Sequence, residues 1–437
     1  MKAEAGLAWI GIIVFGVFTL ILSRGAAPPV VPDSTQRDAV APLPVGSAPP
    51  LPELGIAPRI PAKFSPLVRV NVAERPVSEI TLAVDGSFRI TPVESDRVLH
   101  SAKRLAATAV ETTANGFRIG GREIRATRIE IVPEISPAIW VNDNQYRGVV
   151  RLFRQPDGRM VAVNVLPIED YVASVLDSEM PAAFPKEARQ AQAIVARTYA
   201  IYQMQEGAAH PYFDLFASTR SQKYLGVQYR DAKGRRLAAE SASSRQATAD
   251  TAGMVCTYQS KVFATYYTAV CGGQTTTGRE VFSDAAPPLA CVPCEWCRES
   301  PRYRWNADVS RARIGDALES VFAAQKQSFG GMTAIGISRT SKREGIPIVE
   351  IQDGKRVRTL SAADLRNALP TMTLPSPHFQ VRMAGETVHF SGRGHGHGVG
   401  FCQWGARGQA LAGRGPLDIV RYYYPGAEVV TLDHVSR

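Results

Sequence analysis

One stretch of the chain, residues 166–205, restricts the possible fold more than any other. It reads LPIEDYVASVLDSEMPAAFPKEARQAQAIVARTYAIYQMQ, and apolar residues in its first part recur at helical spacing: Tyr171, Val172, Val175 and Leu176. Pro181 and Pro185 interrupt this pattern, because proline cannot continue a helix. A second helix-forming segment begins near Lys186. The sequence therefore predicts two helices that are separated by a break at the prolines.

The break contains one carboxylate, Glu179, within the sequence Ser178-Glu179-Met180-Pro181. It lies at a helix end beside the apolar Met180 and near Phe184. Apolar surroundings raise the pKa of a carboxyl group and keep it available as a proton donor. The alternative is an exposed residue in a helix–helix turn, which is the usual place for a carboxylate. The residues alone leave both interpretations open.

Composition places the chain among ordinary globular proteins, with 437 residues, of which 45% are hydrophobic and 21% charged. The formal net charge is +10. A positive balance favours an acidic partner such as nucleic acid, an anionic wall polymer or a membrane surface. No nucleic-acid-binding motif occurs in the sequence, and the amino terminus indicates export, so we do not expect a nucleic-acid partner.

The amino terminus carries an apolar run without charges, Leu7–Ser23, between Lys2 and Arg24. One interpretation is an uncleaved membrane anchor, and the other is a signal peptide that is cleaved near residues 25–27. The run exceeds the roughly 7–15 residues of a typical signal core, which favours the anchor. Both interpretations place the body of the protein outside the cytoplasm. The proline-rich segment Gly25–Pro66 then reads as an extended linker.

The remaining chain predicts an α+β fold. Its first part, Leu67–Val165, is β-rich, with a turn at 155–158 and strands at Val68–Val72, Glu79–Val84, Gly116–Ile119, Ile129–Val132, Val149–Phe153 and Met160–Val165. Later strands are expected at Met254–Thr257, Lys261–Ala269, Met332–Ser338 and Ile346–Ile351. Later helices are expected at Arg236–Asp250, Ile314–Ala323, Ser361–Leu369, Gln403–Leu411 and Leu417–Tyr423.

Several motifs occur in a recognisable order: LPIEDYV, SEMP, FPKEARQAQAIVARTYA, CGGQT from Cys271, and GHGVGFCQWGARG around His397. In this order they resemble the SpoIID/LytB family of bacterial cell-wall proteins, from about Leu67 to the end. The resemblance implies a SpoIID-like mixed fold, with the β-rich part 67–165 followed by a catalytic core at 166–437. In that family the glutamate of the SEMP motif is the acid/base of a peptidoglycan lytic transglycosylase. Its counterpart here is Glu179.

The resemblance also implies a set of substrate-binding residues: Arg197, Ser221, Gln222, Tyr224, Gly272, Gly273, His397 and Gln403. Asp214 is a further candidate helper. The chain departs from the family at Gln274, where histidine is frequent and can ligate zinc. The alternating glycines of 392–400 indicate close backbone approach, as a glycan strand in a groove would require.

Cysteines predict a metal site. Cys291, Cys294 and Cys297 form a C-x2-C-x2-C pattern, and Cys271 adds a fourth thiol, enough for one tetrahedral structural zinc. The alternative is disulfides, because export leads to an oxidising space and the total of six cysteines is even. The very short loops between these cysteines favour a metal over disulfides. An iron–sulfur cluster is a third possibility.

A single glutamate suffices for the implied reaction, whereas glycoside hydrolysis usually uses two carboxylates. Asp177 and Glu169 are the nearest carboxylates in sequence, and one placed opposite Glu179 would allow hydrolysis instead. The alternative function is a non-catalytic amidase enhancer that binds peptidoglycan glycan strands and raises the activity of a partner amidase or other wall hydrolase. The sequence leaves open whether stem peptides must first be removed from the glycan.

Overall fold

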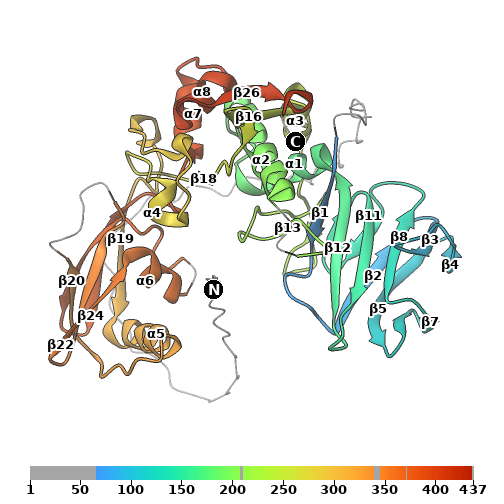
Figure 1. Cartoon of the computed structure of the whole chain (residues 1–437), viewed down its shortest axis with the longest axis horizontal. Helices are drawn as coiled ribbons and strands as arrows, with labels where there is room; N and C mark the ends of the chain where they lie inside the picture. The colour runs from blue at the N-terminus through green and yellow to red at the C-terminus, as the bar shows by residue number, and fades with distance from the viewer. Residues whose placement is uncertain (1–64, 207–209, 339–344, 371, 436–437) are drawn as a thin grey trace, which may run out of the picture.

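A computed structural model describes residues 65–206, 210–338, 345–370 and 372–435 (Figure 1). The apolar run Leu7–Ser23 and almost all of the linker Gly25–Pro66 lie outside the described residues, so anchor and signal peptide both remain predictions. Among the described helices, none has both the length and the apolar character needed to cross a membrane.

Two sheets of mainly antiparallel strands form the first lobe, which is coloured blue to blue-green in Figure 1. Its strands are β1 Leu67–Asn71, β2 Glu79–Val84, β3 Phe88–Pro92, β4 His100–Ala102, β5 Leu105–Thr113, β6 Gly116–Ile119, β7 Arg122–Ile124, β8 Arg128–Pro133, β9 Ile139–Val141, β10 Asn144–Tyr146, β11 Val149–Arg154 and β12 Met160–Pro167. Alternate residues of β2, Ile80, Leu82 and Val84, are buried, as the two-residue repeat of a strand requires. The six strands and the turn predicted for this part are confirmed.

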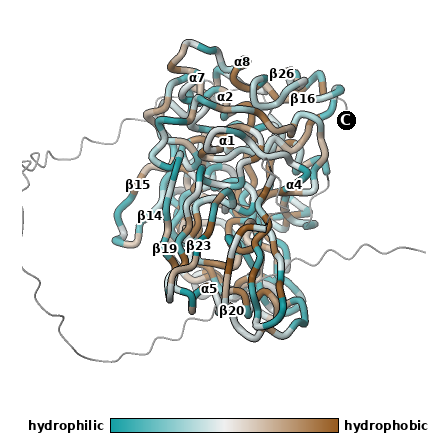
Figure 2. The backbone as a smooth tube through the Cα atoms, turned by 90° about the vertical axis from the view of Figure 1, so that its left-hand side faces the viewer, coloured by the Kyte–Doolittle hydropathy of each residue, from teal (hydrophilic) through white to brown (hydrophobic). Residues whose placement is uncertain are grey.

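The chain returns to both sheets after the central helices. β13 (Leu215–Phe216) extends the seven-stranded sheet, whose order is β13-β1-β12-β11-β8-β3-β4. β14 (Gln228–Arg230) and β15 (Arg236–Ala238) extend the eight-stranded sheet, whose order is β15-β14-β10-β9-β2-β5-β6-β7. The hairpin formed by β14 and β15 projects from the body and is hydrophilic at its tip (Figure 2). The sheets therefore include residues beyond the expected boundary at position 165.

The two helices predicted around the prolines are confirmed as α1 (Ile168–Glu179) and α2 (Lys186–Gln205). Pro167 precedes the first turn of α1, where its fixed backbone angle is tolerated. Met180 ends α1 in an extended conformation directly before Pro181. The prediction of a helix over Arg236–Asp250 is too long, because its first residues pair as β15 and the helix α3 spans Ala242–Asp250. Ser241 caps α3 by accepting a hydrogen bond from the Ser244 N–H.

A second hydrophobic core lies around the carboxyl-terminal helices. It includes the helices α7 (Gln403–Leu411) and α8 (Pro416–Tyr423), both as predicted, and packs against α2. A three-stranded sheet joins β16 (Met254–Tyr258), β17 (Lys261–Val262) and β26 (Glu428–Thr431). The predicted strand Lys261–Ala269 is broken into β17 and β18 (Tyr267–Thr268), and β18 pairs in parallel with β25 (Phe401–Cys402).

Residues 304–393 form the second lobe, with a hydrophobic core of their own (Figure 1, left). It contains β19 Arg304–Ser310, α5 Arg311–Ala324, β20 Met332–Ile337, β21 Ile348–Asp353, β22 Arg356–Ser361, α6 Ala362–Ala368, β23 Phe379–Ala384 and β24 Thr387–Arg393. β19 and β24 are antiparallel, and Arg304 pairs with Arg393. The helices α1 and α2 lie between the two lobes in this view. The expected α+β class is thus confirmed, with many strands and few helices.

Candidate active site

Glu179 is the last residue of α1, and its carboxyl group is held by the segment that follows β13. The Lys223 backbone N–H donates to Glu179 Oε1 at 2.7 Å. Burial raises the pKa of the Glu179 carboxyl group, and this hydrogen bond and the Tyr267 hydroxyl oppose the rise. The residue nevertheless stays partly exposed. This environment matches the expected semi-apolar setting and not a fully solvated turn.

Several buried polar atoms in this region have no hydrogen-bond partner within the described residues. Tyr171 Oη donates to Gln222 Oε1 at 3.1 Å, and both side chains are fully buried. Within the described residues, Gln222 Nε2, Tyr267 Oη and Ser178 Oγ make no hydrogen bond of good geometry. Unsatisfied buried polar atoms are rare in native proteins and are often found where a ligand supplies the missing partner. These three atoms are themselves buried, so small side-chain rotations that pair them with neighbouring protein groups are favoured.

The carboxylates that are closest to Glu179 in sequence are held in ion pairs. Asp177 pairs with Arg189, and Glu169 pairs with Arg197. No carboxylate in the described part of the chain is among the groups that shift the pKa of Glu179. Glu179 is therefore not paired with a second carboxylate among the described residues.

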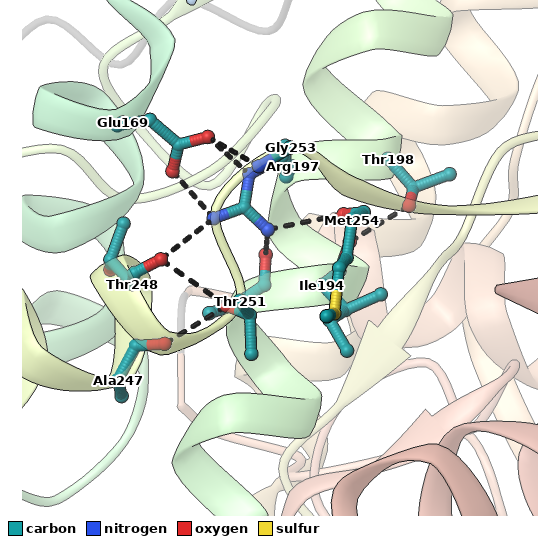
Figure 3. Close-up of polar contacts among 10 residues, drawn as sticks. Glu169, Ile194, Arg197, Thr198, Ala247, Thr248, Thr251, Gly253 and Met254 are labelled. Atoms are coloured by element: carbon teal, nitrogen blue, oxygen red, sulfur yellow. Dashed lines mark hydrogen bonds and ion pairs between the residues drawn. The ribbon is translucent and has the colours of Figure 1, made fainter. Parts of the chain in front are cut away.

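Arg197 requires a correction, because the structure does not place it where a substrate could reach it (Figure 3). Its side chain is 0% exposed, and it donates to Glu169 through Nε (2.8 Å) and Nη2 (2.5 Å). It also donates to the carbonyls of Met254 (3.1 Å) and Thr248 (3.3 Å). Glu169 Oε1 in turn accepts from the Gly253 N–H at 3.0 Å. Arg197 therefore joins α1, α2 and the chain before β16, and it is a structural residue.

Two further predicted substrate-binding residues are also engaged within the protein. Tyr224 is buried and donates through Oη to Asn164 Oδ1 at 2.7 Å, inside the first lobe. The Ser221 hydroxyl accepts from the Phe216 N–H at 3.1 Å. The candidate helper Asp214 accepts three hydrogen bonds from the Arg69 guanidinium, the shortest at 2.6 Å. In this segment, the Lys223 N–H contacts Glu179 directly, and the preceding Gln222 accepts from Tyr171 of the same helix as Glu179.

His397 and Gln403 belong to the carboxyl-terminal motif. Burial lowers the pKa of His397 to about 4, so its ring is neutral at pH 7, and Nδ1 accepts from the Val399 N–H at 3.1 Å. Gln403 Nε2 donates to Gln192 Oε1 at 3.4 Å and so connects α7 with α2. Gln192 Nε2 has no partner of good geometry within the described residues. The two glutamines lie at the boundary between α2 and the second core.

Gly272 and Gly273 have positive φ angles of 74° and 115°, which explains the choice of glycine. A Cβ at Gly272 would lie 2.7 Å from the Gly394 nitrogen. The glycine-rich segment after β24 therefore packs closely against the backbone at Gly272. The sequence predicted close contact of these glycines with a glycan strand, and the structure shows close contact within the protein instead.

Four buried thiols lie close together: Cys271, Cys294, Cys297 and Cys402. All ligand atoms of this group lie within 4.8 Å of one another, and the Cys271 and Cys297 sulfurs are 3.6 Å apart. The predicted set contained Cys291 together with Cys271, Cys294 and Cys297, and the structure has Cys402 in this group in place of Cys291. The neighbouring thiols, first that of Cys271, lower the pKa of the Cys297 thiol.

The separation between the sulfurs distinguishes a metal site from a disulfide. Four sulfurs at about 2.3 Å from a tetrahedral zinc lie about 3.8 Å from each other, whereas bonded sulfurs lie about 2.05 Å apart. The 3.6 Å distance between Cys271 and Cys297 fits the first geometry. The donor set of four thiolates is also one that zinc prefers. The residues present therefore fit a structural zinc.

Tyr267 and Cys402 are the two residues of this region that sequence reasoning missed. Tyr267 lies in a predicted strand, where an aromatic residue usually packs in a core. Cys402 lies far along the chain from the C-x2-C-x2-C pattern. Its position one residue before the Gln403 helix was the available signal, since it is part of the carboxyl-terminal motif.

Comparison with known proteins gives two family matches. A family profile described as stage II sporulation protein matches residues 156–258, which include α1, α2 and α3. A second profile, described as a domain of unknown function, matches residues 296–400.

Several curated relatives are similar to this chain, over different shares of their own length. An uncharacterised protein of Brachyspira hyodysenteriae is 31% identical over 82% of this chain and 91% of its own. The stage II sporulation protein D of Bacillus subtilis is 30% identical over 62% of this chain and 77% of its own. The amidase enhancer of Bacillus subtilis is 24% identical over 59% of this chain and 40% of its own.

These matches and the fold that carries Glu179 define a protein whose function is related to the bacterial cell wall. The chain belongs to the SpoIID/LytB family. The resemblance drawn from the ordered sequence motifs is thereby confirmed.

Proposed function

We propose that this protein is a peptidoglycan lytic transglycosylase that uses Glu179 as its only acid/base. The observation that carries the proposal is the position of this carboxyl group. It is partly exposed at the end of α1, while burial raises its pKa. A carboxylic acid in such a setting remains protonated at a higher pH and can donate its proton.

In the first step, protonated Glu179 donates its proton to the glycosidic oxygen between MurNAc and GlcNAc, and the bond from that oxygen to C1 breaks. In the second step, the resulting carboxylate accepts the proton of the C6 hydroxyl of the same MurNAc. The O6 atom then bonds to C1 and gives a 1,6-anhydro-MurNAc end. The Lys223 N–H orients the carboxyl group throughout. The ion pairs of Asp177 and Glu169 support a mechanism that needs no second carboxylate.

Mass spectrometry of glycan fragments tests this function. Purified protein is incubated with peptidoglycan glycan strands, both with stem peptides and after their removal. Anhydro-MurNAc ends support transglycosylation, and reducing ends would indicate hydrolysis instead. If neither type of strand is cut, the proposal is wrong. Binding without cleavage would then favour the second candidate, a non-catalytic amidase enhancer, which the similarity to a protein of that name supports.

The raised pKa of Glu179 predicts a pH dependence. The rate requires the protonated acid, so it should fall as pH rises through the pKa of Glu179. Because burial raises this pKa, the fall should lie above the ordinary glutamate value of about 4.3. A pH profile of kcat/KM measures it in the free enzyme. A decline centred on the ordinary value would contradict the role of burial.

We also propose that Cys271, Cys294, Cys297 and Cys402 hold one structural zinc. The metal would connect the segment before Gly272 with the start of α7, and four thiolate ligands would leave no open position for chemistry. Elemental analysis of protein purified without added metal is expected to give about one zinc per chain.

Two serine variants distinguish the structural ligand set from the predicted one. Cys402→Ser is expected to lose the zinc and to lower the unfolding temperature, because thiolate–metal bonds stabilise the folded state directly. Cys291→Ser is the matched control and is expected to keep the metal. The opposite result would restore the sequence-based set. Disulfides found by peptide mapping without reduction, in protein free of metal, would exclude the zinc.

We further propose that the protein is exported and faces the cell wall, held by its amino-terminal apolar segment or secreted after cleavage of that segment. The proposal rests on the charge-free run Leu7–Ser23 and on the cell-wall relatives. Its partners would be peptidoglycan glycan strands and an amidase or another wall hydrolase. Similarity to an amidase enhancer supports the second partner.

A further inference from the structure

We propose that Tyr267 is a positioning residue for Glu179, and that its hydroxyl donates a hydrogen bond to the Glu179 carboxylate at the end of a relay through Tyr171 and Gln222. The proposal rests on the proposed function, because it assigns the group that controls the proposed acid/base.

The backbone of Tyr267 is fixed by the surrounding chain. Tyr267 and Thr268 form β18, in which Tyr267 is paired with Phe401 and Thr268 with Cys402. The Thr268 hydroxyl donates to the His395 carbonyl at 2.9 Å, and the Trp404 N–H donates to the Ala269 carbonyl at 3.1 Å. The start of α7 and the glycine-rich segment therefore hold the strand from which the Tyr267 ring reaches the active site.

The Tyr267 hydroxyl is buried, and Gln222 and Glu179 are both among the groups that interact with it electrostatically. It has no hydrogen bond of good geometry within the described residues, although both groups are close enough to influence it. A buried hydroxyl that remains unpaired costs free energy, so a small rotation that forms these bonds is favoured.

The direction of the relay follows from the chemistry of the amide. The Tyr171 hydroxyl donates to Gln222 Oε1, so the Gln222 NH2 group faces the remaining neighbour, Tyr267. If Gln222 Nε2 donates to the Tyr267 oxygen, the single Tyr267 proton is directed to Glu179. In this relay Gln222 and Tyr267 each accept one hydrogen bond from the residue before them and donate one to the residue after them. The relay ends in a hydrogen bond that favours the charged form of Glu179.

This hydrogen bond matters after the first proton transfer. The carboxylate that forms is then stabilised by two donors, the Lys223 N–H and the Tyr267 hydroxyl. Burial raises the pKa of Tyr267 well above its usual value, so its hydroxyl does not lose its proton in the cycle. The charged and titratable groups that face Glu179 are the Lys223 amine, Tyr171 and Tyr267. Of these, Tyr267 is the one that acts through its own side-chain hydrogen bond.

The test is the pKa of Glu179, measured by NMR of protein labelled with 13C at glutamate side-chain carboxyl groups. The signal is assigned by its loss in Glu179→Gln. Tyr267→Phe removes the hydroxyl and keeps the ring, so we expect the pKa of Glu179 to rise by roughly one unit. Tyr266→Phe, the same change one residue earlier, is the matched control and should leave this pKa unchanged.

Gln222→Met is a second variant, which removes the donor to Tyr267 and preserves side-chain length. It should raise the pKa of Glu179 in the same direction by a smaller amount. In kinetics, Tyr267→Phe should move the high-pH decline of the rate upward by the same shift and lower kcat roughly tenfold, with KM little changed. A pKa of Glu179 in Tyr267→Phe that is unchanged or lower would overturn the proposal.

The two proposals can fail separately. The NMR titration requires no catalysis, so a shifted pKa in a protein that cuts no glycan would support the Tyr267 contact and reject the proposed function. Glycan cleavage with an unshifted pKa would reject only the role of Tyr267.

Discussion

Replacement of Glu179 by glutamine is expected to slow the release of anhydro-MurNAc fragments by roughly 10²–10⁴-fold. The amide keeps the shape of the side chain and can still accept from the Lys223 N–H, but it cannot donate a proton and take it back. Fragment release is followed by mass spectrometry under conditions in which both proteins are folded.

Glu206→Gln is a matched control, because Glu206 is an exposed carboxylate at the end of α2. It should cleave glycan like the unmodified protein. Cleavage at the unmodified rate by folded Glu179→Gln would show that another group supplies the proton.

Glu179→Gln should also change the stability of the protein. Activity should fall, whereas stability at neutral pH should rise. The folded-state pKa of Glu179 is raised, so folding disfavours its charged form. The penalty is absent below the unfolded-state pKa and grows as pH rises through the folded-state pKa. Glutamine carries no such penalty, so Glu179→Gln should unfold at a higher temperature than the unmodified protein at neutral pH, and at a similar temperature in acid.

The largest expected effect on stability is that of Arg197→Met, with a loss of about 3–5 kcal/mol of unfolding free energy. Methionine fills a similar volume but leaves the buried Glu169 carboxylate without its partner. The carbonyls of Met254 and Thr248 also lose a donor. Urea unfolding at constant pH, followed by tryptophan fluorescence, measures the change.

Arg118→Met provides the comparison, since Arg118 pairs with Glu111 on the surface, with side chains 57% and 43% exposed. That variant should lose at most about 1 kcal/mol. Adding Glu169→Leu to Arg197→Met should recover part of the loss, because no unpaired charge then remains. Equal effects of the buried and the exposed variants would contradict this account of Arg197.

Periodic segments were predictable from the sequence, and short strands were not. The helices α1, α2 and α8 each carry a repeated apolar pattern or a proline boundary, and their limits match closely. β18 and β25 contain two residues each, which is too few for a repeated pattern. They are strands because they pair with each other, although they are far apart in the sequence. The residues of β15 were assigned to a helix because their polar, alanine-rich surroundings resemble one, but pairing with β14 decides otherwise.

The position of Glu179 at the break between α1 and α2 was predictable, because the residue lies within a single motif at the end of a helical pattern. Tyr267 and Cys402 lie near groups that are distant from them in sequence, so only the three-dimensional arrangement reveals them. Arg197 illustrates the converse error. A motif indicates that a residue is needed, but burial against Glu169 shows that this one is needed for the fold.

The pairing of Arg304 with Arg393 has a consequence for the history of the gene. Opposite residues of antiparallel strands lie only about 5 Å apart, so the segment between them begins and ends at nearly the same point. The cysteines Cys297 and Cys402 are close in space just outside both ends. Evolution can therefore exchange, enlarge or delete the coding sequence for 304–393 without changing the gap that the rest of the polypeptide must bridge.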